Sequence, residues 1–170
     1  MAEIEGTAHV LGDAIDTDLL APGVYMKGPI EELARHCLEA IDPGFADRVR
    51  PGDLLVAGSR FGIGSSREQA AQALRLLGIR AVVARSFAGI FYRNALNNGL
   101  LAVVCPDHEG IETGDRLRLD PVAGRLVHLP SGRAHACRPL PDRLLAMVEA
   151  GGLVPWLERR FSAAGRGAQT

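Results

Sequence analysis

The segment of this chain whose residue types are best suited to binding or catalysis is a glycine-rich run. It ends with two hydroxyls, a guanidinium and a carboxylate. It reads Gly58-Ser59-Arg60-Phe61-Gly62-Ile63-Gly64-Ser65-Ser66-Arg67-Glu68. Glycines permit tight turns and expose main-chain N–H groups, and the start of a helix adds partial positive charge. Ser65 and Glu68 also fit a capping box, with Ser65 as the cap of the next helix. The run therefore predicts an anion site, and a purely structural turn with a cap is the alternative.

Three further segments join this run in a recognisable order. They are residues 12–18, which contain Asp-Thr-Asp, residues 80–94, which end in Phe-Tyr-Arg-Asn, and residues 98–101. Together the four motifs resemble the swivel domain of the aconitase superfamily, over most of residues 8–150. Four ordered motifs are far more specific than a glycine pattern alone. Within that superfamily the chain is similar to the small subunits of two-subunit hydro-lyases of the 3-isopropylmalate dehydratase type.

The resemblance implies an α/β fold of the swivelling β/β/α type. It also implies a hydro-lyase subunit that isomerises a 2-hydroxy acid by removing water and adding it back in the other sense. The named reaction would be that of 3-isopropylmalate dehydratase in leucine biosynthesis. Related enzymes polarise the leaving hydroxyl with a [4Fe–4S] cluster. This chain is expected to hold no cofactor, so the resemblance implies a large catalytic subunit that carries the cluster and completes the site.

The resemblance also assigns roles to residues of the two loop motifs. Ser65 would be the catalytic base, because the glycine-loop amides, the helix start and Arg67 all favour its ionised form. Arg67 is suited to bind a substrate carboxylate with two parallel bonds, and Ser66 would add one hydrogen bond. Asp18 matches a family active-site aspartate that would orient polar groups, although an Asx turn explains it equally simply.

Two positions depart from the family pattern. Many members have cysteine between the glycines where this chain has Ile63, which should alter packing under the loop without removing a catalytic group. Lys27 lies in the loop with which the family distinguishes substrate side chains, where isopropylmalate enzymes tend to be apolar. A cation there suits an additional carboxylate, so a homoaconitase-like or other substituted-malate dehydratase is the second hypothesis. A solvated lysine is the structural alternative.

A third hypothesis is a non-catalytic anion-binding module. It is disfavoured, because the run lacks both the G-x-G-x-x-G pattern and the G-K-[ST] ending of phosphate loops. A net charge of −1 gives no field that would attract nucleic acid or an anionic membrane. The chain has no apolar run of the ~20 residues that span a bilayer. Its first residues lack a signal-peptide pattern, so a cytoplasmic location is expected.

The three cysteines, Cys37, Cys105 and Cys137, are widely spaced in the sequence. An odd number of distant cysteines argues against a disulfide framework. The absence of C-x-x-C spacing argues against an iron–sulfur cluster site in this chain. Cys37 lies on an apolar helical face and Cys105 at the end of an apolar strand, so both are expected in the core. No metal-ligating residues are therefore predicted.

The elements that must position these motifs follow from the apolar pattern. Short apolar runs at 54–57, 81–84 and 100–104 alternate with helical patterns at 69–77 and 87–96, which predicts a parallel sheet buried on both faces. Ser86 is expected to cap the second of these helices. An earlier strand at 8–11 leads into the Asp-Thr-Asp loop, and a helical face spans 30–41. A hairpin is predicted at 116–129 and a helix from Pro141. One domain over residues 1–161 is expected, with a frayed tail at 162–170.

Overall fold

One seven-stranded sheet organises the computed structural model, which describes residues 1–167 and their side chains through Ser162. Its strand order is β4-β3-β2-β1-β5-β6-β7. The strands are β1 (Ile4–Val10), β2 (Leu54–Ala57), β3 (Ala81–Ala84), β4 (Leu101–Val104), β5 (Arg116–Asp120), β6 (Arg125–His128) and β7 (Arg133–Ala136). Strands β1 to β4 pair in parallel, and β1, β5, β6 and β7 pair antiparallel. Strand β1 therefore joins the two halves.

The burial of the strands follows the kind of pairing. Every residue of β2 and β3 is buried, as the continuous apolar runs predict for a sheet covered on both faces. In β5, by contrast, Leu117 and Leu119 are buried and their neighbours are not. The predicted parallel core and the predicted hairpin are both confirmed.

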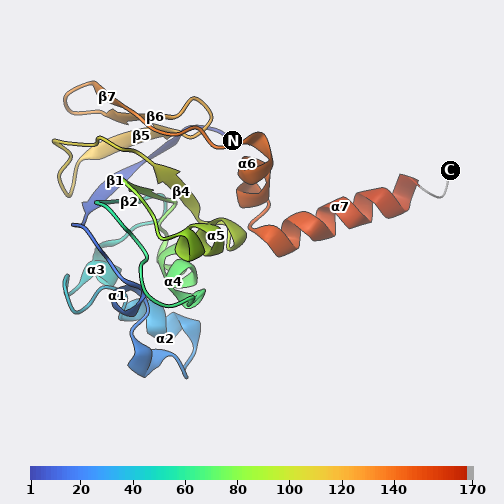
Figure 1. The fold of residues 1–170 in the computed structure, drawn as a ribbon, viewed down its shortest axis with the longest axis horizontal. Coiled ribbons are helices and arrows are strands. Elements are labelled where there is room, and N and C mark those ends of the chain that lie inside the picture. Colours follow the sequence, from blue (N-terminus) through green and yellow to red (C-terminus); the bar gives the residue numbers. More distant parts are fainter. Residues whose placement is uncertain (168–170) are drawn as a thin grey trace.

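The helices before β4 gather on the parallel half of the sheet. They are α1 (Thr17–Leu20), the 3₁₀ helix η1 (Gly23–Tyr25), α2 (Ile30–Arg35), α3 (Phe45–Arg48), α4 (Gln69–Leu77) and α5 (Gly89–Asn97). Figure 1 shows the antiparallel strands at the top of the molecule and α1 to α4 below them. Helix α2 ends earlier than predicted, because turns follow it and Leu38 adopts a left-handed φ of 62°.

The C-terminal part consists of two helices, α6 (Asp142–Glu149) and α7 (Leu153–Gly167). Gly151 and Gly152 between them both have positive φ, and α7 projects away from the rest of the molecule (Figure 1). A frayed tail is predicted from Ser162, but the helix continues to Gly167. The alanines at 163 and 164 explain this continuation, because alanine favours helix without large apolar neighbours. Residues 168–170 of the predicted tail lie outside the described residues. No helix within residues 1–167 is long and apolar enough to cross a membrane.

Candidate active site

Two of the sequence motifs leave the sheet at the same edge. The Asp-Thr-Asp loop follows β1 and the glycine-rich run follows β2, and the carboxyl ends of parallel strands meet at one edge of a sheet. Main-chain hydrogen bonds join the two loops directly. The N–H of Gly62 donates to the Ile15 carbonyl at 2.7 Å, and the N–H of Thr17 donates to the Ile63 carbonyl at 2.8 Å. The two loops therefore form one structure.

Two glycines of the run are required by this close approach. Gly62 has a φ of 79°, and a β-carbon there would lie 2.2 Å from the Phe91 side chain. Gly64 has a φ of 108°, and a β-carbon there would lie 2.9 Å from the Thr17 hydroxyl oxygen. Both conformations are left-handed and disfavour any residue with a side chain. The glycines thus bring Ser65 against the first loop.

Ser65 is exposed and lies beside the buried side chain of Thr17. Their hydroxyl oxygens are 3.2 Å apart, and the Ser65 main-chain N–H donates to Thr17 Oγ1 at 3.0 Å. Because Thr17 Oγ1 accepts that bond, its own O–H is available to donate to Ser65 Oγ. The sequence reasoning assigned no role to Thr17. The signal for it was its place between the two aspartates of a motif that was otherwise recognised.

The capping box predicted for this segment is wrong. Helix α4 begins at Gln69, and the residue before it, Glu68, is already helical and makes no side-chain cap bond. Ser65 lies upstream of that helix start and contacts Thr17 instead. The turn at Gly64 and the bonds to Thr17 explain the difference, because they hold Ser65 against the other loop. Ser86, expected to cap the following helix, accepts the N–H of Arg60 at 2.9 Å, and α5 begins at Gly89.

The fold brings Arg67 and Asp18 into contact, an ion pair that the sequence did not predict. Nη1 of Arg67 contacts Oδ1 of Asp18 and also donates to the Ala21 carbonyl at 3.1 Å. These two contacts occupy both N–H groups of Nη1. The N–H groups on Nε and Nη2 make no hydrogen bond within the described part of the chain, and that edge of a guanidinium can bind a carboxylate with two parallel bonds. Arg67 is 26% exposed at its side chain, so an anion can reach it.

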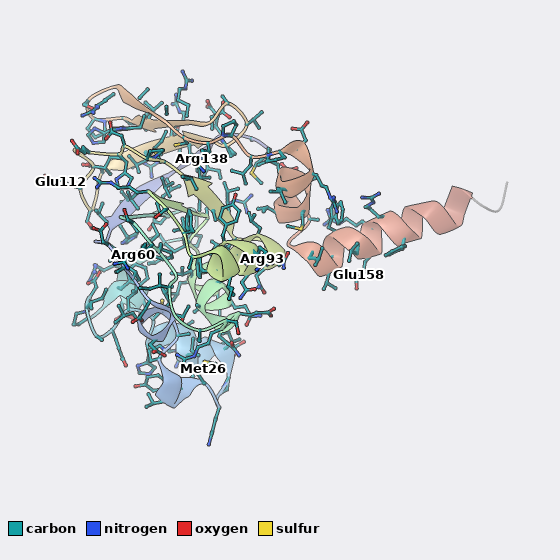
Figure 2. All side chains as sticks on the ribbon, viewed as in Figure 1. Met26, Arg60, Arg93, Glu112, Arg138 and Glu158 are labelled. Carbon is teal, nitrogen blue, oxygen red and sulfur yellow. The ribbon has the colours of Figure 1, made fainter. Side chains whose placement is uncertain are left out.

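Ser66 and Lys27 are both exposed. The carbonyl of Ser66 accepts a bond from Asn94 Nδ2 at 3.2 Å, which ties the loop to helix α5. Lys27 lies in the loop between η1 and α2, where Figure 2 labels the adjacent Met26. The helix η1 before this loop begins near the guanidinium, since a β-carbon on Gly23 would be 3.9 Å from Arg67 Nη2. No contact joins Lys27 itself to the other predicted residues in the described structure.

The thiols of this chain do not form a set that fits an iron–sulfur cluster. Cys37 is fully buried, and burial raises the pKa of its thiol. Cys105 and Cys137 are brought close by the fold, with Cys105 Sγ 3.6 Å from the carbonyl of Ala136, next to Cys137. Cluster sites use more thiolates than such a pair. Among the described residues there is no group of three His, Cys, Asp or Glu arranged to hold a metal.

Comparison with known proteins shows the family of this chain. The Aconitase C-terminal domain family matches residues 31–108. The 3-isopropylmalate dehydratase small subunit 1 of Methanopyrus kandleri is 48% identical over 92% of this chain and 93% of its own length. The corresponding small subunit of Moorella thermoacetica is 45% identical over 92% of this chain and 96% of its own length. The chain belongs to the 3-isopropylmalate dehydratase small-subunit family.

A solved member of the 3-isopropylmalate dehydratase family has the same fold. The crystal structure of the 3-isopropylmalate dehydratase protein from Methanocaldococcus jannaschii superposes with a TM-score of 0.91. The two sequences are 40% identical, and the match covers 98% of this chain and 99% of the Methanocaldococcus chain. The predicted family and the predicted α/β fold are therefore both confirmed.

Proposed function

We propose that this chain is the small subunit of a 3-isopropylmalate dehydratase and works with a large subunit in leucine biosynthesis. The observation that carries the proposal is the hydroxyl pair of Ser65 and Thr17, formed by the same two chain segments that place the Arg67 guanidinium against Asp18 and the Ala21 carbonyl. A base and a carboxylate-binding cation are the two groups that this chain must offer to a 2-hydroxy acid. Membership of the family supports the same reaction.

Ser65 acts in this proposal as the base. Its alkoxide takes the proton from the carbon next to a substrate carboxylate. The electrons of that C–H bond form the carbon–carbon double bond while the hydroxide leaves the neighbouring carbon. Readdition of water in the other sense returns the proton from Ser65. The hydroxyl of Thr17 donates to the alkoxide and lowers the cost of forming it, and the nearby Arg67 cation acts in the same direction.

Arg67 orients the substrate in this scheme. Its Nε and Nη2 donors bind one carboxylate, while Asp18 and the Ala21 carbonyl hold the opposite nitrogen in place. Asp18 is thus a positioning residue, and Ser66 supplies a further hydrogen bond from the exposed side of the loop. Because Asp18 lies at the end of the Asp-Thr-Asp motif and Ala21 directly follows helix α1, Arg67 is held only when the glycine-rich run and this first segment are in contact.

The Lewis acid for the leaving hydroxyl belongs, in our proposal, to the large subunit. The cysteines of this chain do not fit a cluster, whereas the relatives are named as small subunits of an enzyme of this class. We also propose that residues 1–161 form one domain and that the complex operates in the cytoplasm.

A homoaconitase-like substrate is the second candidate, and Lys27 is the observation that favours it. Lys27 is exposed on the loop that follows η1, the short helix whose first residue, Gly23, lies near Arg67. A cation there suits an additional carboxylate better than an isopropyl group, whose burial against an unpaired charge is unfavourable.

Reconstitution tests this function directly. The chain and the large subunit from the same organism are purified, combined without oxygen and supplied with 3-isopropylmalate, homoaconitate or citraconate. Turnover of 3-isopropylmalate with the highest kcat/KM supports the proposal, and a preference for homoaconitate supports the second candidate. A complex that turns over none of the three would contradict both.

A further inference from the structure

A hollow opens beside the candidate site, between the turn after β3 and the segment after β7. Its volume is about 460 Å³. The residues that line it come from the turn after β3, the first turn of α5, the end of β4 and the segment after β7: Arg85, Ser86, Phe87, Gly89, Tyr92, Val104, Arg138 and Pro139. No role follows for this hollow from the Ser65 chemistry.

The hollow combines two cations with hydroxyl donors and has no acidic residue in its lining. Arg85 and Arg138 are both exposed, and the side chains of Ser86 and Tyr92 add O–H groups. Burial raises the pKa of the Tyr92 hydroxyl, and the nearby cation of Arg138 opposes that effect, so the phenol stays protonated and can donate. The chemistry of this lining is that of an anion site.

Neither guanidinium is neutralised by a close carboxylate in the described part of the chain. Arg85 approaches Glu109 only to 4.0 Å, and the Glu109 side chain is 74% exposed. Such a loose surface pair is worth little. Arg138 makes no ion pair with any described acidic residue. The two charges are therefore available to a group from outside the chain.

The main chain holds both arginines in place. The N–H of Arg138 donates to the Val104 carbonyl at 2.8 Å, and the N–H of Arg85 donates to the Gly58 carbonyl at 3.1 Å. Figure 2 shows Arg138 between the antiparallel strands and helix α5. An anion site built on anchored backbone loses less entropy on binding than one on a free loop.

The position of the hollow indicates its partner. Ser86 accepts the N–H of Arg60 from the glycine-rich run, and Phe87 packs edge-on against Phe61 at 6.0 Å between ring centroids. The hollow thus lies next to the candidate site, on the same carboxyl-terminal edge of the parallel strands. A large subunit that covers an exposed Ser65 must also come close to this edge.

We propose that this hollow, lined by Arg85 and Arg138, is a docking site for an acidic side chain of the large subunit. The inference rests on the proposed function. The two arginines recognise the large subunit and fix its position on this chain. Their guanidinium groups and the hydroxyls of Ser86 and Tyr92 bind the carboxylate. Charge pairs at protein interfaces fix the register of the partners and speed their association, and removing one member of a buried pair weakens binding.

The test compares association of the two subunits across arginine variants. The double variant Arg85→Ala/Arg138→Ala should weaken the dissociation constant for the large subunit by at least about tenfold, with a smaller salt dependence. The matched control is Arg125→Ala, which removes an exposed arginine from β6, outside the hollow, and should stay within about twofold of the parent. Circular dichroism and melting curves of each isolated variant verify that the fold is kept.

A chemical readout identifies the bound group. With Arg138→Lys, a carbodiimide that joins amines to carboxylates without a spacer should link residue 138 to an aspartate or glutamate of the large subunit, found by mass spectrometry. Arg125→Lys should give no such link. Association of the double variant within twofold of the parent would overturn the inference while leaving the proposed function intact.

A third experiment tests whether the hollow binds small anions instead of the large subunit. Malonate and phosphate are titrated against the isolated parent chain and the double variant. Arginine-dependent binding of either anion that leaves subunit association unchanged would overturn docking in favour of a small-molecule site. A parent chain that forms no complex with the large subunit would overturn this inference and the proposed function together.

Discussion

Ser65 depends on Thr17 more directly than on the helix that follows it. Its hydroxyl and its main-chain N–H both meet Thr17 Oγ1, whereas α4 begins only at Gln69. Ser65 is therefore a surface hydroxyl held by a buried neighbour, which in the proposed mechanism stabilises its ionised form. Its removal should affect chemistry much more than folding.

Ser65→Ala should lower kcat of the reconstituted enzyme by about 10²-fold or more, the typical worth of a positioned base. The free energy of unfolding should fall by no more than about 1 kcal/mol, the value of one exposed hydrogen bond. The control is Ser59→Ala in the same glycine-rich run, which should be neutral because the Ser59 hydroxyl makes no hydrogen bond in the described structure. Turnover of the Ser65 variant within a few-fold of the parent would make Ser65 a purely structural residue.

Arg67→Lys should raise KM for the hydroxy acid and lower kcat/KM, because an ammonium cannot reproduce the side-on fork of Nε and Nη2. The ionic contact to Asp18 is one that lysine can partly keep, so the melting temperature should change little. Steady-state kinetics of the reconstituted pair measure the effect. Unchanged kinetic constants would place Arg67 outside the substrate site.

Lys27→Val should shift preference from polycarboxylates toward branched apolar malates. An unpaired ammonium facing an isopropyl group is unfavourable, and valine removes that penalty. The measurement is the ratio of kcat/KM for homoaconitate and for 3-isopropylmalate, before and after the change. A ratio that does not move would show that this loop does not contact the variable part of the substrate.

At the scale of elements, a buried hydrogen bond between two side chains links β1 to the turn before β2. His9 Nε2 donates to Asp53 Oδ2 at 2.9 Å, and the side chains of both residues are about 8% exposed. Asp53 also accepts the main-chain N–H groups of Arg50 and Thr7. Burial by itself would raise the pKa of Asp53, but these three hydrogen bonds outweigh it and hold the pKa below its ordinary value.

This pair makes stability depend on pH in a defined direction. An aspartate whose pKa is lower in the folded than in the unfolded chain stabilises fully above the unfolded value, about 3.9, and loses that contribution as pH falls through the folded value. Asp53→Asn should cost about 1–3 kcal/mol at neutral pH, because an amide cannot accept every donor around it. As the pH falls from about 4 to below the folded pKa of Asp53, the variant should also lose less stability than the parent.

Urea unfolding at a series of pH values measures both effects. Asp47→Asn is the matched control, since Asp47 is exposed and should change stability by no more than about 0.5 kcal/mol. Equal pH profiles for the parent and the Asp53 variant would contradict the depressed pKa of the buried carboxylate.

At the scale of the whole molecule, the division of labour between subunits can be tested by metal analysis. The isolated chain should bind no stoichiometric iron after anaerobic treatment with iron and sulfide, because its thiols do not form a cluster set. The complex with the large subunit should bind iron and show catalysis. A stoichiometric cluster in this chain alone would contradict the two-subunit scheme.

Much of the architecture followed from local pattern. Continuous apolar runs predicted the parallel strands, because a strand covered on both faces has no polar side. Glycine spacing and the order of four motifs predicted the family and brought attention to Ser65, Arg67 and Asp18. These features are properties of neighbouring residues, which a sequence displays directly. Element ends were less predictable, as the early end of α2 and the continuation of α7 show.

The sequence by itself determined which chemical groups this protein carries and which strands bury its core, since side-chain type and apolar period are local quantities. Only the tertiary structure decided which of those groups meet. Thr17 reaches Ser65 across 48 positions, and Arg138 lies in the same hollow as Arg85 although they are far apart in the chain. The physical reason is the order of the strands, which no local pattern specifies. The parallel pairing of β1 to β4 collects their loops at one edge, and the segment after β7 returns to that edge, where the N–H of Arg138 donates to the Val104 carbonyl.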